Sequence, residues 1–169
     1  MILIRLFLTF FILQFIKLPL FYKLILIILT DLLDSKPHPK NPLYRSCPIE
    51  QDNHTNEFLY QISDKIADLF SYYMILLYLN HVNFLPKNKI KLLFQLLLFR
   101  TIGVICFIFT EERSFLFFFP NLFLEFCLFF LAQKRFQFGK QNECLYYLVI
   151  FVWKFLQEYY LHVYIPNSV

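Results

Sequence analysis

Residues 92–109 read LLFQLLLFRTIGVICFIF, an almost unbroken apolar run with one arginine, Arg100, near its middle. A helix needs about 20 apolar residues to cross the hydrocarbon core of a bilayer, with a range of about 17–25. This run meets that length and predicts a transmembrane helix. An ionisable group inside such a helix is costly, so Arg100 is a candidate for an internal ion pair or a functional site.

The rest of the chain has a similar composition. Of its 169 residues, 59% are hydrophobic and 17% are charged, whereas an average soluble domain is about 25% charged. One soluble domain of this size cannot hide so much apolar surface, because folded chains of ~150 residues bury only ~70% of their surface. The presence of only two glycines excludes a glycine-rich phosphate loop. We therefore expect an integral, multi-pass membrane protein whose partner is the lipid bilayer, with no nucleic acid partner.

Three further segments are long and apolar, and charged connectors separate them. They are residues 58–79, 115–132 and 144–165. Pro120-Asn121 interrupts the second segment, so we expect a kinked helix whose freed backbone groups find partners in neighbouring helices. The first 34 residues form either a tight helical hairpin, which gives six spans in total, or one tilted or interfacial helix, which gives five. We favour the hairpin, with its turn in the Lys17–Lys23 region.

The one long polar segment is residues 35–57, SKPHPKNPLYRSCPIEQDNHTNE. Its four prolines forbid a continuous helix, and we expect a loop at the membrane surface. The sequence therefore predicts an all-α fold, a polytopic transmembrane helical bundle that forms a single integral membrane domain over residues 1–169. Basic residues are almost evenly divided between the two sides, with a small excess on the side that holds residues 86–91 and 133–143. The positive-inside rule therefore leaves both orientations open.

Two pairs of aspartates lie at the boundaries of the predicted spans. Asp31 and Asp34 are three residues apart, and Asp64 and Asp68 are four apart. Both spacings put the two side chains on one face of a helix. If the two helix ends are neighbours, four carboxylates converge, and hard oxygen ligands of this kind suit Mg²⁺ or Mn²⁺. In the alternative interpretation, the first pair ends a helix in water and Asp64 pairs with a neighbouring lysine such as Lys65.

The spacing of these aspartates resembles the CDP-alcohol phosphatidyltransferase family of membrane enzymes. The family motif is D-x-x-D-G-x-x-A-R, a spacer, and G-x-x-x-D-x-x-x-D. Here Asp31-Leu-Leu-Asp34 matches the first half and Asp64-Lys-Ile-Ala-Asp68 matches the second, whereas the glycines and the Ala-Arg of the motif are absent.

The resemblance implies a reaction of phospholipid synthesis. The four aspartates would hold Mg or Mn ions, which grip the pyrophosphate of the lipid substrate and neutralise developing charge. Asp68 would be the catalytic general base on the incoming alcohol. Arg45 is the nearby basic residue for substrate binding. The products would be a phospholipid and CMP.

Polar residues inside the later spans are not explained by that family. Arg100 and Glu125 lie near the middle of adjacent antiparallel helices, which predicts an ion pair between them. The alternative for Arg100 is the cation of an anion or headgroup site. Lys154 and Glu158 are four residues apart on one helix and are expected to pair.

Three classes of function therefore stay open. The first is the metal-dependent phosphotransferase, and the second is a non-enzymatic subunit or assembly factor of a membrane complex. The second class predicts polar groups that pair locally, aromatic faces that stay exposed, and no water-filled cavity. The third is a transporter or channel, which at this size would work as a homo-oligomer.

Overall fold

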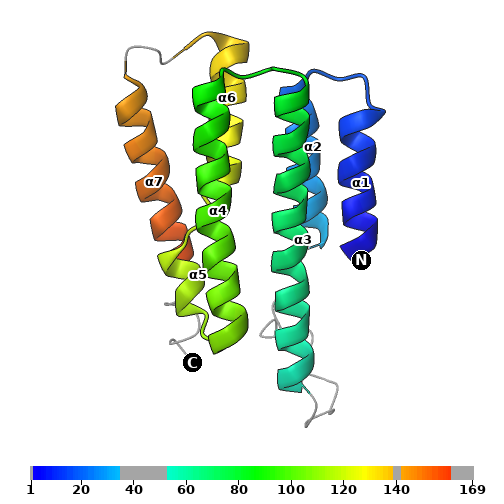
Figure 1. Ribbon diagram of the computed structural model, residues 1–169, viewed down its shortest axis with the longest axis vertical. Helices are drawn as coiled ribbons and strands as arrows, with labels where there is room; N and C mark the ends of the chain where they lie inside the picture. The colour runs from blue at the N-terminus through cyan, green and yellow to red at the C-terminus, as the bar shows by residue number, and fades with distance from the viewer. Residues whose placement is uncertain (1, 35–52, 139–141, 161–169) are drawn as a thin grey trace.

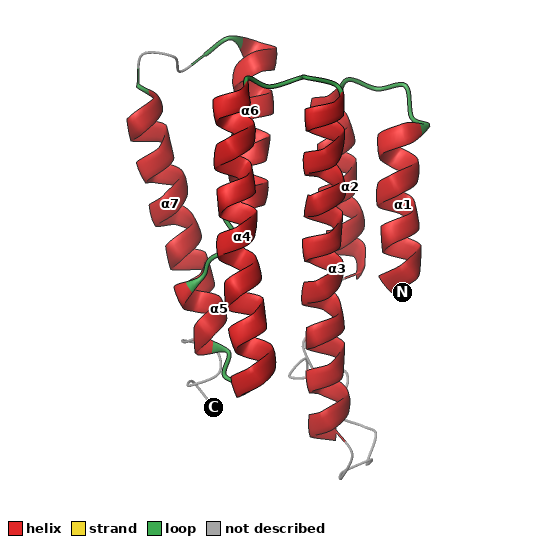
Figure 2. Ribbon diagram, in the orientation of Figure 1, coloured by secondary structure: helices red, strands yellow, loops and turns green. Residues whose placement is uncertain are grey.

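The computed structural model describes residues 2–34, 53–138 and 142–160, and every regular element in them is a helix (Figure 1, Figure 2). The all-α fold predicted from the sequence is confirmed. The described helices are α1 Ile2–Gln14, α2 Leu20–Asp34, α3 Asn53–His81, α4 Lys87–Thr110, α5 Ser114–Phe118, α6 Phe123–Phe136 and α7 Glu143–Tyr159.

The helices run up and down in a bundle of six antiparallel passes, in which α5 and α6 together make one pass (Figure 1). The α1–α2 and α3–α4 turns lie at the same end of the bundle as the last turn of α6 and the first turn of α7. We call this the connecting end. The hairpin predicted for the first 34 residues is confirmed, because α1 and α2 pack against each other around a short turn.

Two helical stretches are long and apolar enough to cross a membrane. They are Lys87–Thr110, which is α4, and Ser114–Phe136, which is α5 and α6 taken together. The helices α1 and α2 have 13 and 15 residues, fewer than the ~20 that a straight span needs. The structure thus combines two full-length candidate spans with shorter or more polar helices.

The predicted polar loop ends earlier than expected. Helix α3 begins at Asn53, so residues 53–57 are helical and the predicted boundary at residue 57 is wrong. The physical reason is that Pro48 is the last proline of the segment, so no fixed φ angle or missing N–H interrupts a helix after it. Residues 35–52 lie outside the described part of the chain, and Arg45 lies among them.

The main core fills the space between α2, α3, α4 and α6. Its most deeply buried side chains include Leu24, Ile75, Leu79, Leu93 and Phe123. A second, smaller cluster around Phe107 packs where α4 meets α5. These clusters hold the helices that carry the polar residues described below.

Lys23 is inside the bundle rather than in a connector. It lies in the first turns of α2, is 6% exposed, and donates hydrogen bonds to the Leu13 carbonyl at 2.7 Å and to the Tyr78 hydroxyl at 3.2 Å. The carbonyls of the last turn of α1 have no partner within their own helix, and a cation there is favourable. Lys23 therefore joins α1, α2 and α3.

Gly103 lets the segment after α5 approach α4. A Cβ atom at this position would lie 2.3 Å from the Cβ of Phe119, far closer than two carbon atoms can pack. The glycine is therefore required by the close approach of Phe119, and this contact positions the residues that follow α5.

Candidate functional site

The clearest polar site surrounds the break between α5 and α6. Helix α5 ends at Phe118 and α6 begins at Phe123, with Pro120 between them. Proline has no backbone N–H and cannot continue a hydrogen-bonded helix. The break therefore leaves carbonyl groups at the end of α5 and N–H groups at the start of α6 that need other partners. The predicted interruption at Pro120-Asn121 is confirmed.

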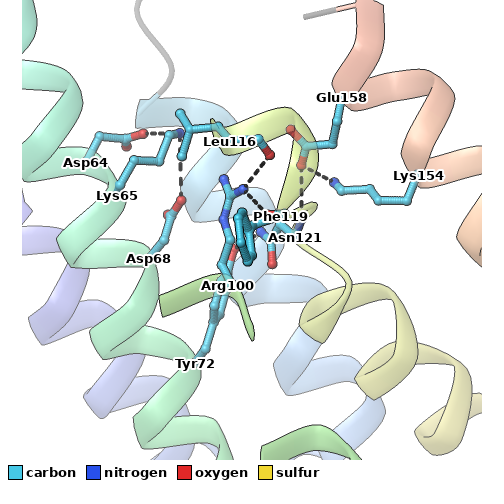
Figure 3. A network of polar contacts seen from close by, with 10 residues as sticks. All are labelled: Asp64, Lys65, Asp68, Tyr72, Arg100, Leu116, Phe119, Asn121, Lys154 and Glu158. Carbon is cyan, nitrogen blue, oxygen red and sulfur yellow. Dashed lines mark hydrogen bonds and ion pairs between the residues drawn. The ribbon is translucent and has the colours of Figure 1, made fainter. Parts of the chain in front are cut away.

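Arg100 supplies donors for the end of α5. Its Nη1 atom donates to the Leu116 carbonyl at 3.0 Å and to the Phe119 carbonyl at 2.7 Å, and the residue is only 4% exposed (Figure 3). A positive charge beside the C-terminal carbonyls of a helix is electrostatically favourable. Arg100 thus connects α4 to the break and satisfies groups that proline has freed.

Asn121 joins the other side of the break to two more helices. Its backbone N–H donates to Glu158 Oε1 of α7 at 3.2 Å, and its side-chain amide donates to the Tyr72 hydroxyl of α3 at 2.6 Å (Figure 3). A carboxylate near the N-terminal end of α6 is favourable for the same electrostatic reason. Residues from α3, α4 and α7 therefore converge on the break.

Lys154 forms ion pairs with two carboxylates at this site. Its Nζ lies 2.8 Å from Glu125 Oε1 and 3.7 Å from Glu158 Oε1. The predicted Lys154–Glu158 pair is confirmed. We refer to Tyr72, Arg100, Asn121, Glu125, Lys154 and Glu158 together as the break centre.

The predicted ion pair between Arg100 and Glu125 is wrong. Arg100 binds the backbone carbonyls at the end of α5, and Glu125 binds Lys154. The physical reason is the position of the two residues. Glu125 is in the first turn of α6, next to α7, whereas Arg100 lies next to the Leu116 and Phe119 carbonyls. The role of Arg100 as the cation of a headgroup site stays a prediction.

Two acceptor atoms of the break centre are buried without a protein partner. They are Asn121 Oδ1 and Glu125 Oε2. A buried acceptor that receives no hydrogen bond costs about 1–3 kcal/mol. Each of these two atoms can accept one further hydrogen bond.

The second polar site is on α3, at the predicted catalytic and metal-binding aspartates. Lys65 Nζ lies 2.9 Å from Asp64 Oδ2 and 3.9 Å from Asp68 Oδ2 (Figure 3). The structure therefore brings these aspartates together on one helix face, and the predicted pairing of Asp64 with Lys65 is confirmed. We call them the α3 carboxylate pair.

The metal site predicted at four aspartates is only half described. The backbone of Asp31 and Asp34 belongs to the last turn of α2, but their side chains lie outside the described part of the structure. Among the side chains that are described, no group of three or more His, Cys, Asp or Glu could hold a metal ion. Binding of Mg or Mn stays a prediction.

A third polar cluster, at the connecting end, was missed by the sequence analysis. Glu143, the first residue of α7, accepts hydrogen bonds from Gln133 at 2.8 Å, from Tyr147 at 3.0 Å and from Lys89 at 3.2 Å. The Gln133 hydrogen bond, helped by Tyr147 and Lys89, lowers the pKa of the Glu143 carboxyl. The signal available in the sequence was an acid at the start of one helix opposite a lysine at the start of another.

Comparison with known proteins does not show which of these sites is functional. No protein-family model matches it. A search of curated proteins found no match, and a search of solved structures found none either. The resemblance to CDP-alcohol phosphatidyltransferases therefore stays a prediction that rests on the aspartate spacing.

Proposed function

We propose that this protein is a multi-pass integral membrane protein that acts as a structural helical subunit or assembly factor of a membrane complex. In this proposal all six helical passes lie in the bilayer, with α5–α6 as one broken span. The observation that carries it is the inverted polarity of α7. Its buried residues are Lys154 and Glu158, whereas the exposed fraction is 68% for Trp153 and 59% for Leu156.

An inverted helix of this kind fits lipid better than water. Charged groups within a span face the protein interior and pair there, because lipid cannot solvate them. The apolar groups that would be hidden in a soluble protein then face acyl chains. Other exposed side chains of α7 follow the same pattern, namely Leu145, Leu148, Val149, Phe151 and Val152.

A structural role is supported by how the charges are used. The Lys154–Glu125 pair of the break centre and the Lys89–Glu143 pair each connect two helices, and Arg100 donates to two backbone carbonyls at the break. Such contacts hold helices in register. The exposed apolar faces of the bundle remain available to lipid or to helices of neighbouring subunits.

Cysteine accessibility tests the membrane placement. In a variant whose four native cysteines are alanine, a single cysteine replaces Val152, in the middle of α7, or Lys17, in the α1–α2 turn. We expect the protein to stay with membranes washed at alkaline pH, and a membrane-impermeant maleimide to label the Lys17→Cys variant but not the Val152→Cys variant. The Lys17→Cys variant is tested in inside-out and right-side-out vesicles. Rapid labelling of both variants, or release by the alkaline wash, would overturn the proposal.

The second candidate function is the metal-dependent CDP-alcohol phosphotransferase of phospholipid synthesis. It is favoured by the position of Asp64 and Asp68 on one face of α3, at the spacing of the family motif. In the reaction, the alcohol oxygen attacks the phosphorus that bears the lipid, the pyrophosphate bond breaks, and CMP leaves. Asp68 accepts the hydroxyl proton, and Arg45 contributes a positive charge to the substrate.

A CMP-release assay tests this candidate. Purified protein is incubated with CDP-diacylglycerol, an alcohol and Mg²⁺ or Mn²⁺, and compared with the Asp68→Asn variant. Loss of a general base lowers the rate by about 10²–10⁴-fold. Equal release by both proteins, or release that does not depend on the metal, would eliminate the candidate. The Asp52→Asn variant is a matched control for the loss of one acidic charge.

A further inference from the structure

A groove between α3 and α4 opens near the connecting end. Its volume is about 470 Å³, within the ~300–1,000 Å³ of small-molecule sites. One part is apolar and is lined by Tyr73, Leu77 and Phe94. The other is polar and is lined by Asn80, Lys87 and Lys91. We call it the lysine groove.

The polar part of the lysine groove concentrates positive charge. Lys87 and Lys91 are four residues apart, so they lie on the same face of α4. Both are exposed, and neither makes an ion pair with a described residue. Lys89 lies between them in the sequence but on another face, where Glu143 neutralises it. The two groove lysines therefore favour an anion.

The apolar part of the groove favours a hydrocarbon chain. Tyr73, Leu77 and Phe94 are each about half exposed, and they continue along α3 and α4 away from the lysines. Because α3 and α4 are antiparallel passes (Figure 1), the groove follows the bundle axis, which is the direction of acyl chains in a bilayer. Its volume accommodates part of a lipid chain.

We propose that the lysine groove binds one anionic phospholipid, with the phosphate headgroup at Lys87, Lys91 and Asn80 and an acyl chain on Tyr73, Leu77 and Phe94. Basic pockets between transmembrane helices bind anionic lipid headgroups on the cytoplasmic side. Lys134 and Arg135, in the last turn of α6, add further positive charge at the connecting end. The inference goes beyond the structural role and uses the bilayer placement only as the source of lipid.

The polar end of this groove is separate from the α3 carboxylate pair. Asn80 follows Asp68 by 12 residues on α3, which is about 18 Å along the helix axis at ~1.5 Å per residue. The headgroup end of the lysine groove is therefore separate from the α3 carboxylate pair. Loss of lipid binding and loss of CMP release would be independent results.

Native mass spectrometry of the purified full chain in neutral detergent tests the proposal. Phosphatidylglycerol and phosphatidylcholine with identical acyl chains are titrated in parallel. Two lysines near an anionic headgroup predict about 20- to 30-fold tighter binding of phosphatidylglycerol. The Lys87→Gln/Lys91→Gln variant should lose this preference. The Lys17→Gln/Arg135→Gln variant removes the same charge from exposed positions at the connecting end and should retain it.

A second pair of variants tests the acyl-chain part of the groove with all lysines present. Leu77→Trp fills the apolar part and should weaken phosphatidylglycerol binding at least tenfold, whereas Leu98→Trp, at an exposed position of α4 outside the groove, should not. Helicity by circular dichroism checks that each variant is folded. Equal binding of the two lipids, an equal loss in both charge variants, or full competition by inorganic phosphate would each overturn the proposal. The assay is made in detergent, so its outcome does not depend on membrane insertion.

Discussion

In the break centre and at the α3 carboxylate pair, a lysine lies between two carboxylates, yet the two sites differ in how many helices they join. Lys65, Asp64 and Asp68 belong to a single helix. Lys154 and its partners Glu125 and Glu158 come from α6 and α7, and Glu158 continues to Asn121 at the break. The side chains of Lys154 and Glu158 are also less exposed than those of the α3 group.

This difference separates a structural polar site from one that is available for chemistry. Removing a partner from a buried site that joins several helices leaves charges in a place that water cannot reach. Removing a partner from a site within one turn leaves charges that can turn toward solvent or bind a cation. The following predictions test this difference in order of decreasing effect on stability.

Substitution of Lys154 by Met should cause the largest loss. Glu125 and Glu158 then face each other without a cation, and breaking a buried ion pair from one side costs about 3–5 kcal/mol. Thermal unfolding in detergent measures the loss. Lys17→Met, at an exposed lysine, is the control, and adding Glu125→Gln to Lys154→Met should restore part of the stability. If Lys154→Met loses no more stability than Lys17→Met does, the break centre does not stabilise the bundle.

Substitution of Arg100 by Met should cost about 2–3 kcal/mol. The variant loses charge-assisted hydrogen bonds to two carbonyls, and buried carbonyls without donors are destabilising. Both bonds come from one nitrogen, Nη1, so Arg100→Lys should keep part of the stability. Arg135→Met is the matched control. If Arg100→Lys is as unstable as Arg100→Met, the two hydrogen bonds from Nη1 do not explain the contribution of Arg100 to stability.

Substitution of Lys65 by Met should cost less, about 0.2–1 kcal/mol, as for partly exposed ion pairs within one helix. If the α3 carboxylate pair takes part in metal binding, the same variant should gain more thermal stability from Mg²⁺ than the wild type does, because the competing ammonium group is gone. The triple variant Lys65→Met/Asp64→Asn/Asp68→Asn is the control. If it gains the same thermal stability from Mg²⁺, the metal binds to another part of the protein.

Acidification should have the smallest and most local effect, at the Glu143 cluster. The folded-state pKa of Glu143 is lowered, so its contribution is fully present above the unfolded pKa of about 4.3 and is lost as the pH falls through the folded pKa. Between about pH 5 and about pH 3, the wild-type melting temperature should fall further than that of Glu143→Gln. Parallel curves for the two proteins would contradict the assignment.

The sequence predicts the features that depend on local chemistry. The break follows from Pro120, whose missing N–H acts wherever the residue is placed. The Lys154–Glu158 pair follows from helical spacing. The hairpin follows from the turn that contains Pro19, since proline is favoured at the start of a helix such as α2.

Features that depend on packing between helices could not be predicted in the same way. The acceptors of Arg100 are backbone carbonyls, which every residue has, so no sequence pattern marks them. The charge of Lys23 predicts a position in the connector. In the structure, its ammonium group instead lies inside the bundle and donates to the Leu13 carbonyl near the end of α1. The boundary at Asn53 was missed because polar composition does not itself prevent a helix.

The break between α5 and α6 also has a consequence for the order in which the bundle assembles. Helix α5 has five residues, too few to be stable alone, and its Leu116 carbonyl accepts from Arg100 only when α4 is packed against it. The start of α6 gains its carboxylate partner from α7, which is made later in synthesis. The break centre is therefore complete only when α7 docks, because Lys154 and Glu158 both come from that helix.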